Sequence, residues 1–536
     1  MAVDPLKYDE NNSKSMNKWD TDIYPLIISC KVQNYQLLPF FSETSIGSSY
    51  IYPLIIKCES QNYQFLPFFP EIFIGSSLIF FLVCGSLLES SPKYNYPVIC
   101  FHSNTIIVLI WILLLCQINL YTTLTPYFVV DNLGSITKIF LGLGLLGCLG
   151  VSKTEKIKAY EYYVLTLLGL LGLCFIASSQ DFLSIYLGLE LISLSFYILA
   201  SFQRYSAFST EAGLKYFLLG AISSALLLFG ISISYGFSGT INLSHMASLF
   251  IEASEESQVY FKFIQIGLFF FTVGLFFKLG VVPFHGWLPD VYEGAPTSVT
   301  VIFAVLPKIA IFVILIRFLN STSPYLWNSL FLSLALLSLF VGSLASLYQT
   351  KIKRLLAYSG ISHVGYALVA LSCGTLDSTS ASIFYIFIYI VTSLFLWGLL
   401  ICVENKGGRS LYLTDIIIWG KTNIVLAFTA ILVVFSIAGI PPLGGFFAKF
   451  AVFASSIEVS LYYGTLLGVL TSAFGILYYL RLVKFLSFEE STIYSYSTLS
   501  KLHALSMGVA ALFLVFFIFF GNSFSYLTYA ISMSSI

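Results

Sequence analysis

The sequence predicts an all-helical, polytopic membrane protein with about fourteen transmembrane helices. Three observations support this class: apolar segments of about 20 residues recur along most of the 536 residues, 58% of all residues are hydrophobic, and only 10% are charged. A soluble chain of this length would carry about a quarter of its residues as charged side chains and would divide into several domains. The 26 basic and 26 acidic residues balance, so net charge indicates neither a nucleic-acid partner nor an acidic substrate.

Residues 1–65 are predicted to form an N-terminal extension that contains a tandem duplication. Residues 23–49 closely match residues 51–77. Two copies are fewer than a solenoid needs, so we interpret them as a duplication within the gene. Only the second copy continues into a long apolar segment, and we therefore expect the first copy to lie outside the bilayer. The mixture of lysines and acids before it is typical of neither a secretory signal nor an import sequence.

Hydropathy divides the rest of the chain into fourteen predicted spans. The first three fall within residues 66–151, the next five within 160–319, five more within 326–484, and the last at 502–521. In order, the spans are 69–88, 103–121, 135–151, 160–178, 182–203, 212–236, 262–293, 297–319, 326–348, 353–373, 380–403, 422–455, 459–484 and 502–521.

The seventh and twelfth spans are too long for one crossing and contain helix-breaking residues. The breakers lie in the segments 278–285 (KLGVVPFH) and 438–446 (AGIPPLGGF). Proline removes a backbone donor and clashes with the preceding turn, so each span should consist of two half-helices around an unwound segment. Unwound backbone at membrane depth is tolerated where it lines a protein interior or a wet cavity. Interrupted helices at corresponding positions of two halves indicate an ion pathway between inverted repeats.

The loop lysines and arginines indicate an orientation. Most of them follow odd-numbered spans, and we assign only Lys138, Lys262 and Arg317 to loops after even-numbered spans. The positive-inside rule then places the odd-numbered connections in the cytoplasm or matrix and both termini on the opposite side.

Five ionisable residues remain inside predicted spans after the loop charges are removed: Glu190, Lys215, Lys278, Lys308 and Lys449. A charge in the bilayer is costly and marks an ion or proton route more often than a structural pair. Burial disfavours the ammonium form of lysine, and a nearby carboxylate restores it. Moving a carboxylate charge can therefore switch a buried lysine between holding and releasing a proton. Lys215 lies near a span end, where snorkelling to the interface is the competing interpretation.

Two histidines are further candidates for proton relay. His285 lies at the break of the seventh span and His363 lies in the middle of the tenth, and a structural hydrogen bond is an equal alternative for each. The nine cysteines show neither a CxxC pair nor metal-ligand spacing with histidine, so the sequence predicts no metal site.

Four segments of this sequence resemble the antiporter-like subunits of respiratory complex I, and most of all their subunit 2 branch (subunit N in bacteria). The resemblance covers about residues 66–521. The segments are 277–297 (FKLGVVPFHGWLPDVYEGAPT), 211–217 (EAGLKYF), 349–359 (QTKIKRLLAYS) and 438–449 (AGIPPLGGFFAK).

This resemblance implies fourteen helices with inverted repeats over helices 4–8 and 9–13, broken helices 7 and 12, and proton pumping coupled to quinone reduction. The family's motif positions fall on the same five charged residues. No cofactor is expected in this chain, because NADH, FMN, iron–sulfur clusters and ubiquinone bind elsewhere in such a complex. The expected partners are lipids and other membrane-arm subunits, including neighbouring antiporter-like ones. The expected location is the mitochondrial inner membrane, with both termini in the intermembrane space.

Three other functions remain open at this point. A multi-subunit cation/proton antiporter has the same general design, but the ending at 292–295 (YEGA) differs from the larger relatives that such antiporters resemble. The second alternative is the equivalent subunit of a plastid NADH dehydrogenase-like complex. The segment 211–215 favours the mitochondrial subunit over this plastid subunit. A purely structural membrane scaffold is the third, and the lysines inside the spans argue against it.

Overall fold

The structure is a computed structural model that describes residues 68–89, 105, 108, 122–125, 127–152, 159–251, 258–322, 324–404, 412–417, 424–489 and 501–534. These residues belong to the second of two compact units, Pro67–Ile536. The predicted extension 1–65, the first copy of the duplication and most of the predicted span 103–121 lie outside the described residues.

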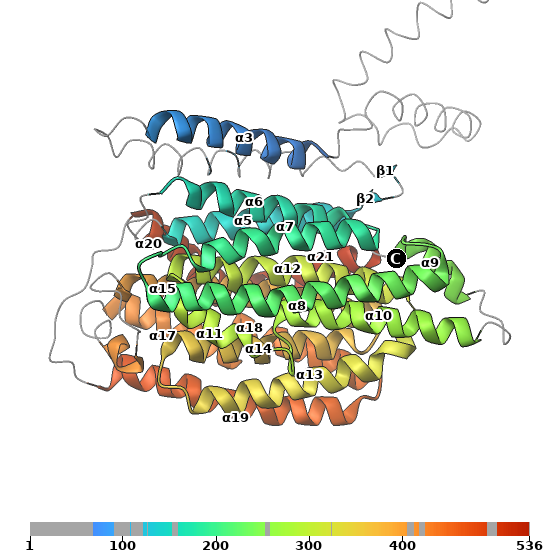
Figure 1. Ribbon diagram of the computed structural model, residues 1–536. Coiled ribbons are helices and arrows are strands. Elements are labelled where there is room, and N and C mark those ends of the chain that lie inside the picture. Colours follow the sequence, from blue (N-terminus) through green and yellow to red (C-terminus); the bar gives the residue numbers. More distant parts are fainter. Residues whose placement is uncertain are drawn as a thin grey trace, which may run out of the picture. The chain divides into compact units, whose positions relative to one another are not determined.

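Helices make up almost all of the described chain, and most of them run side by side in roughly one direction (Figure 1). The helices before the first break are α3 (Phe69–Glu89), α5 (Asn132–Ser152), α6 (Glu161–Ser178), α7 (Phe182–Ala200), α8 (Ala207–Ser238), α9 (Leu243–Ile251) and α10 (Gln258–Leu279). Those that follow it are α11 (Trp287–Gly294), α12 (Thr297–Ser321), α13 (Pro324–Leu347), α14 (Ile352–Leu371), α15 (Leu376–Glu404), the 3-10 helix η4 (Leu413–Ile416), α17 (Ile424–Ala438), α18 (Gly444–Glu458), α19 (Tyr462–Ser487), α20 (Lys501–Val515) and α21 (Phe517–Met533).

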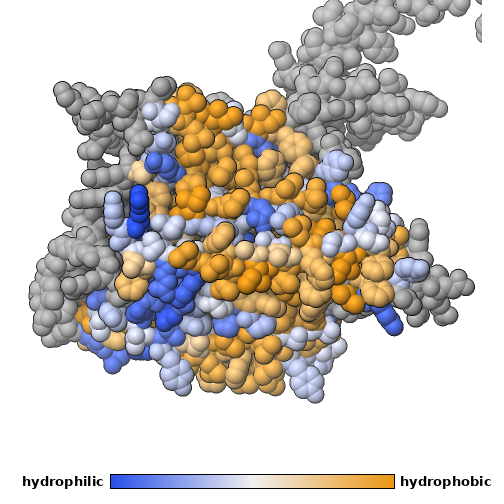
Figure 2. Space-filling model, viewed as in Figure 1, coloured by the Kyte–Doolittle hydropathy of each residue, from blue (hydrophilic) through white to orange (hydrophobic). Residues whose placement is uncertain are grey.

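Ten of the described helices are long and apolar enough to cross a membrane. Apolar side chains cover much of the face seen in Figure 2, and hydrophilic side chains gather mainly towards the helix ends. Exposed apolar surface of this extent suits a lipid environment and would be unusual in a soluble monomer. The chain is therefore a multi-pass, all-helical membrane protein, as the sequence predicts.

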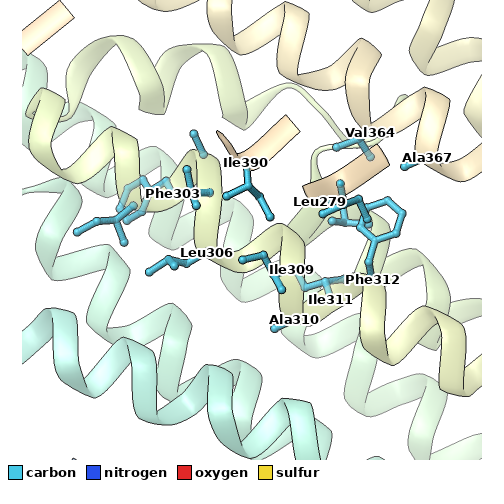
Figure 3. Close-up of a cluster of buried hydrophobic side chains, with 14 of the residues drawn as sticks. Leu279, Phe303, Leu306, Ile309, Ala310, Ile311, Phe312, Val364, Ala367 and Ile390 are labelled. Carbon is cyan, nitrogen blue, oxygen red and sulfur yellow. The ribbon is translucent and has the colours of Figure 1, made fainter. Parts of the chain in front are cut away.

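Helix α12 lies at the centre of the packing, and almost every one of its residues is buried. It packs against α5, α6 and α15, and it also contacts α7 and α10. In Figure 3 its side chain Phe312 lies beside Leu279 of α10, and Ile309 lies near Ile390 of α15. A helix that is apolar all round is expected in such a buried position. Any charged side chain on α12 is consequently held inside the protein.

The two predicted breaks are present. Helix α10 ends at Leu279 and α11 starts at Trp287, while α17 ends at Ala438 and α18 starts at Gly444. A glycine with positive φ follows each first half-helix: Gly280 has φ 75° and Gly439 has φ 89°. A side chain is strained in this left-handed region, so glycine is the residue that can turn the chain there.

Three local features differ from the sequence-based expectation. The region predicted as one helix at 502–521 contains α20 and the start of α21, which are bent by 88° relative to each other, and the bend buries Phe517 against rings of α15 and α18. The nine-residue helix α9 is too short to give a span-length hydropathy signal. A two-stranded antiparallel sheet pairs β1 (Thr122–Thr125) with β2 (Phe128–Val130) before α5.

The three basic residues assigned to loops after even-numbered spans all lie inside helices, Lys262 in α10 among them, and this corrects the charge assignment. Lys138 is buried in α5 and forms an ion pair with the buried carboxylate of Glu71 in α3. Arg317 lies in α12, where it contacts Asp131 at 2.8 Å and donates to the Ser179 carbonyl oxygen. Both residues lie near helix ends, where hydropathy alone cannot distinguish an outer turn from a loop.

Candidate functional site

The first part of the site lies between α7 and α10. Lys278 occupies the last turn of α10, its Nζ atom is buried, and that atom has no hydrogen-bond partner among the described residues. Glu190 of α7 lies close enough to interact electrostatically with it, and Ser193 donates a hydrogen bond to Glu190. The ring centroid of Tyr197 lies 5.8 Å from Nζ. A buried ammonium beside one carboxylate depends strongly on that carboxylate's charge.

The second part is Lys308, which follows Pro307 in the middle of α12. Only 4% of Lys308 is exposed. Its Nζ donates a hydrogen bond of 2.6 Å to the hydroxyl of Tyr389 on α15 and lies 4.3 Å from the centre of that ring. The ammonium therefore combines a charge-assisted hydrogen bond with a cation–π contact, which compensates part of the cost of burial.

The third part is His363, which lies in the middle of α14 among tyrosines. Its Nδ1 is 2.7 Å from the hydroxyl of Tyr385, and its Nε2 is 3.0 Å from the hydroxyl of Tyr479. The ring of Tyr389 lies 5.2 Å away, centre to centre. Lys308 and Lys449 both act on His363 electrostatically. His363 is thus the buried histidine between the lysine of α12 and the lysine of α18.

The fourth part is Lys449, which lies in α18 just beyond the second break. Its Nζ donates a hydrogen bond of 2.7 Å to the carbonyl oxygen of Ala438, the last residue of α17, and lies 5.4 Å from the centre of the Tyr366 ring. A Cβ atom at Gly439 would lie 2.9 Å from Lys449 Cδ and 3.1 Å from Nζ. The glycine therefore leaves the space in which the lysine reaches back to the broken end of α17.

Two small internal cavities lie along this series. The first is lined by Lys278, Lys308 and Ser193, together with aromatic and apolar side chains. The second is lined by His363, Tyr385, Tyr389, Thr392 and Lys449. In each cavity the centre of a water-sized sphere can move within a volume of about 20 Å³. Each cavity therefore has room for about one water molecule. Polar side chains that can bind a water surround the second cavity.

Lys215 lies apart from this buried series. Its side chain is 43% exposed, and Nζ lies 2.8 Å from Glu211 and 3.0 Å from Asp290. Asp290 belongs to α11, so the pair joins α8 to the second half of the broken helix. The network continues through Arg354, Glu293 and Lys351.

His285 also lies outside the series. It is half-buried in the break itself, and its ring centre is 6.5 Å from that of Tyr358. Among the described residues, its one ring contact is with this tyrosine, and its buried Nδ1 has no hydrogen-bond partner. The structure therefore brings together Glu190 with Lys278, and Lys308 with His363 and Lys449, but does not add Lys215 or His285 to them.

The tyrosines around His363 are the residues that the sequence did not single out. Tyr385 and Tyr389 belong to α15 and Tyr479 to α19, far from His363 along the chain. The sequence contains 35 tyrosines, so an individual tyrosine carries little information. The predicted spans 297–319, 353–373 and 422–455 contain Lys308, His363 and Lys449 but no carboxylate, which could have suggested that hydroxyl groups complete the site.

A sequence model of one family matches residues 179–475, and its description is NADH:quinone oxidoreductase/Mrp antiporter, transmembrane. The chain is 37% identical over 470 residues to NADH-ubiquinone oxidoreductase chain 2 of Marchantia polymorpha, covering 84% of this chain and 95% of that protein. It is 40% identical over 378 residues to NADH-quinone oxidoreductase subunit N of Paramagnetospirillum magneticum, covering 69% of this chain and 77% of the relative.

The fold is also similar to that of a chain in a solved complex. The match is to respiratory complex I from Thermus thermophilus with bound aureothin, with a TM-score of 0.71 and 29% identity. It covers 83% of this chain and 97% of the chain in the complex. The alignment therefore extends over nearly the full length of that neighbour.

Proposed function

Because the chain belongs to the NADH:quinone oxidoreductase/Mrp antiporter family and is similar to complex I chain 2 and subunit N over most of its length, we propose that it translocates protons as a non-redox membrane-arm subunit of an NADH:ubiquinone oxidoreductase. In this proposal the enzyme is the whole complex, which couples quinone reduction to pumping. NADH, FMN, the iron–sulfur clusters and ubiquinone bind to other subunits.

The observation that carries the proposal is the series of buried ionisable groups through the apolar core. Lys278, Lys308 and Lys449 have buried ammonium groups, and two small cavities and His363 lie among them. Two charges about 8 Å apart interact by roughly 2 kcal/mol at an effective dielectric constant of about 20. A charge displaced near Glu190 can therefore alter the protonation of Lys278. In the same way, the charge on each lysine can alter the protonation of the next lysine in the series.

The proposed architecture has fourteen spans, with inverted repeats over helices 4–8 and 9–13. The equivalent breaks after α10 and α17 support it, because each has a positive-φ glycine three residues before a proline, at Gly280 with Pro283 and at Gly439 with Pro442. In this arrangement both termini face the intermembrane space.

The proposed location is the mitochondrial inner membrane, with lipids and neighbouring antiporter-like subunits as partners. Support comes from the match to a plant chain 2 over 84% of this chain and from the Thermus complex I neighbour. A cation/proton antiporter subunit is the second candidate, because the family description includes Mrp antiporters.

The proposal can be tested on the assembled complex. The chain is affinity-tagged, purified in mild detergent and assayed for NADH:ubiquinone reductase activity, and the complex is then reconstituted to measure proton uptake. We expect Lys278→Ala to lower both rates by about 100-fold, the size of effect that loss of a proton-transfer group produces. Lys262→Ala is the matched control, because Lys262 lies on the same helix but is exposed.

Three results would count against this function. Purification of the chain without NADH:ubiquinone activity but with Na⁺/H⁺ exchange would select the antiporter. Pumping at the normal rate by the Lys278→Ala complex would remove the buried series from the proton route. An equal loss in the Lys262→Ala control would show that the assay reports assembly and not proton transfer.

A further inference from the structure

We propose that the hydroxyl of Tyr389 passes protons between the two halves of the buried series, from Lys308 on one side to Lys449 on the other. The inference rests on the proposed function and adds to it a residue without charge. Tyr389 lies in the middle of α15, and its half-buried side chain contacts or lies beside residues of α12, α14 and α18.

The first observation is the contact with Lys308. The donor–acceptor distance of 2.6 Å is at the short end for a hydrogen bond from a charged nitrogen to oxygen. Lys308 is 4% exposed and lines the first cavity together with Lys278. Tyr389 therefore accepts the hydrogen bond of Lys308 and does not line the first cavity, in whose wall Lys278 and Lys308 lie.

The second observation is that Tyr389 lines the second cavity. That cavity is also lined by His363 and Lys449, and it has room for about one water molecule. The hydroxyl of Tyr389 thus contacts the lysine of the first cavity while its side chain forms part of the wall of the second. No other described residue combines a hydrogen bond to Lys308 with a place on this wall.

The third observation is the position of Gly360 on α14. A Cβ atom there would lie 3.1 Å from the Tyr389 hydroxyl and 3.2 Å from Lys308 Nζ. Such distances are tighter than most side-chain contacts in proteins, so the absence of a side chain at Gly360 leaves the lysine and the hydroxyl undisturbed.

The step is balanced without any co-reactant. Lys308 gives one proton to the Tyr389 oxygen while the hydroxyl proton leaves to a water in the second cavity, so one O–H bond forms as another breaks. Tyr389 is neutral before and after. The water passes a proton to Lys449, whose ammonium then donates to the Ala438 carbonyl oxygen. The same path operates in reverse, so it is compatible with either direction of pumping.

His363 is not the direct carrier in this path, because neither ring nitrogen is hydrogen-bonded to a lysine or to Tyr389. The nitrogens lie 2.7 and 3.0 Å from the hydroxyls of Tyr385 and Tyr479. The ring lies beside Tyr389, and both lysines act on it electrostatically. We therefore assign His363 a positioning role and Tyr389 the transfer itself.

Three substitutions at this position separate transfer from positioning. Tyr389→Phe keeps the ring and removes the hydroxyl. Tyr389→Gln can still accept the hydrogen bond of Lys308 but cannot readily exchange protons, whereas Tyr389→His has a similar size and can do so. Tyr163→Phe is the control, because Tyr163 on α6 is a buried tyrosine that lines neither cavity.

The measurements are proton uptake by the reconstituted complex, NADH-driven quinone reduction, and assembly on a native gel. We expect Tyr389→Phe and Tyr389→Gln to lower proton uptake by about 10-fold, equivalent to about 1.4 kcal/mol in the activation barrier. Tyr389→His should be clearly faster than Tyr389→Gln, and Tyr163→Phe should stay within about twofold of the wild type.

The outcomes distinguish this inference from the proposed function. If Lys308→Ala blocks pumping while Tyr389→Phe pumps normally, the relay through Tyr389 is wrong and the function stands. If Lys308→Ala also pumps normally, the proposed function itself is wrong. Equal rates of proton uptake in the Tyr389→His and Tyr389→Gln variants would show that Tyr389 only holds Lys308 in place and does not transfer protons. Loss of assembly in all three Tyr389 variants would make the tyrosine a folding determinant and overturn the relay.

Discussion

At the first break Lys278 lies before the unwound segment, in the last turn of α10, whereas at the second break Lys449 lies after it, in the first half of α18. The surroundings of the two ammonium groups differ as well. Lys278 Nζ has no hydrogen-bond partner among the described residues and interacts with Glu190. Lys449 Nζ instead donates to the carbonyl oxygen of Ala438 at the broken end of α17.

This difference indicates two ways of holding a proton in an apolar interior. The charge on Lys278 is compensated by a carboxylate, whose own charge can change. The charge on Lys449 is compensated by a free carbonyl at a helix C-terminus, where the partial charge of the helix dipole is fixed and negative. The first lysine can therefore be switched by its partner, while the second depends on the geometry of the break.

The largest effect is expected when Lys449 is replaced by arginine, because this change tests whether a permanent charge is sufficient. Arginine stays protonated under all accessible conditions, so it can compensate the Ala438 carbonyl but cannot release a proton. We expect Lys449→Arg to lower proton uptake by about 100-fold. Lys484→Arg, at an exposed lysine of α19, is the control. Normal pumping by the Lys449→Arg complex would show that Lys449 only supplies a fixed positive charge. The proposed difference in proton holding between Lys278 and Lys449 would then be wrong.

A second, smaller effect is expected from Glu190→Gln, which removes the carboxylate and keeps the shape of the side chain. Two charges about 8 Å apart interact by roughly 2 kcal/mol at an effective dielectric constant of about 20, and an interaction of that size between Glu190 and Lys278 corresponds to roughly 30-fold in proton affinity. Proton uptake and quinone reduction should fall together, by up to about that factor. Stopped-flow measurement of both rates is the test, and wild-type rates in this variant would show that Lys278 needs no carboxylate.

The charged part of the site can be predicted from the sequence because the bilayer makes isolated charges conspicuous. Glu190, Lys278, Lys308 and Lys449 stand alone in apolar segments, and the helix breakers near Lys278 and Lys449 mark the two half-helix pairs. The bounds of most helices follow from the same apolar segments to within a few residues. Short α9 and the bend between α20 and α21 do not, because neither has a length or proline signal.

The uncharged part of the site cannot be predicted in this way. Tyr389 meets Lys308 only because α12 and α15 pack together, although the two positions are 81 residues apart in the sequence. Likewise, Lys138 and Glu71 are both near helix ends in the sequence, and only packing of the first helices makes them a buried pair. Contacts between distant segments depend on the packing of whole helices, about which the pattern of a single segment carries no information.

Alanine substitution of the positive-φ glycine at each break, Gly280 or Gly439, should have an effect of intermediate size on proton uptake, and the size should differ between the two breaks. Alanine at either position costs about 1–2 kcal/mol of backbone strain in the left-handed region. Only Gly439→Ala also moves a lysine, because its Cβ would lie 2.9 Å from Lys449 Cδ, whereas the Cβ at Gly280 would meet Leu288. We expect both variants to lower the melting temperature of the complex similarly. Gly439→Ala should lower proton uptake about 10-fold further, about 1.4 kcal/mol in the barrier.

The comparison at the glycines is decided by the ratio of pumping to assembled protein. If Gly280→Ala and Gly439→Ala lose pumping in proportion to their loss of assembly, the position of Lys449 relative to the break has no influence on transfer. A selective loss in Gly439→Ala, with the native-gel band retained, would support the view that the second lysine depends on local geometry.

The smallest effect is expected at Lys215, although it is one of the five charged residues that stand out in the sequence. Its side chain is 43% exposed and pairs with Glu211 and Asp290, and Asp290 keeps a second partner in Arg354 when Lys215 is removed. Exposed ion pairs contribute little, so Lys215→Gln should lower proton uptake by no more than about fivefold. High salt screens exposed pairs, so the difference between Lys215→Gln and the wild type should shrink as ionic strength rises, whereas the loss in Lys278→Ala should not change. A loss at Lys215 as large as that at Lys278, and insensitive to salt, would mean that this lysine becomes buried during the cycle and belongs to the transfer series.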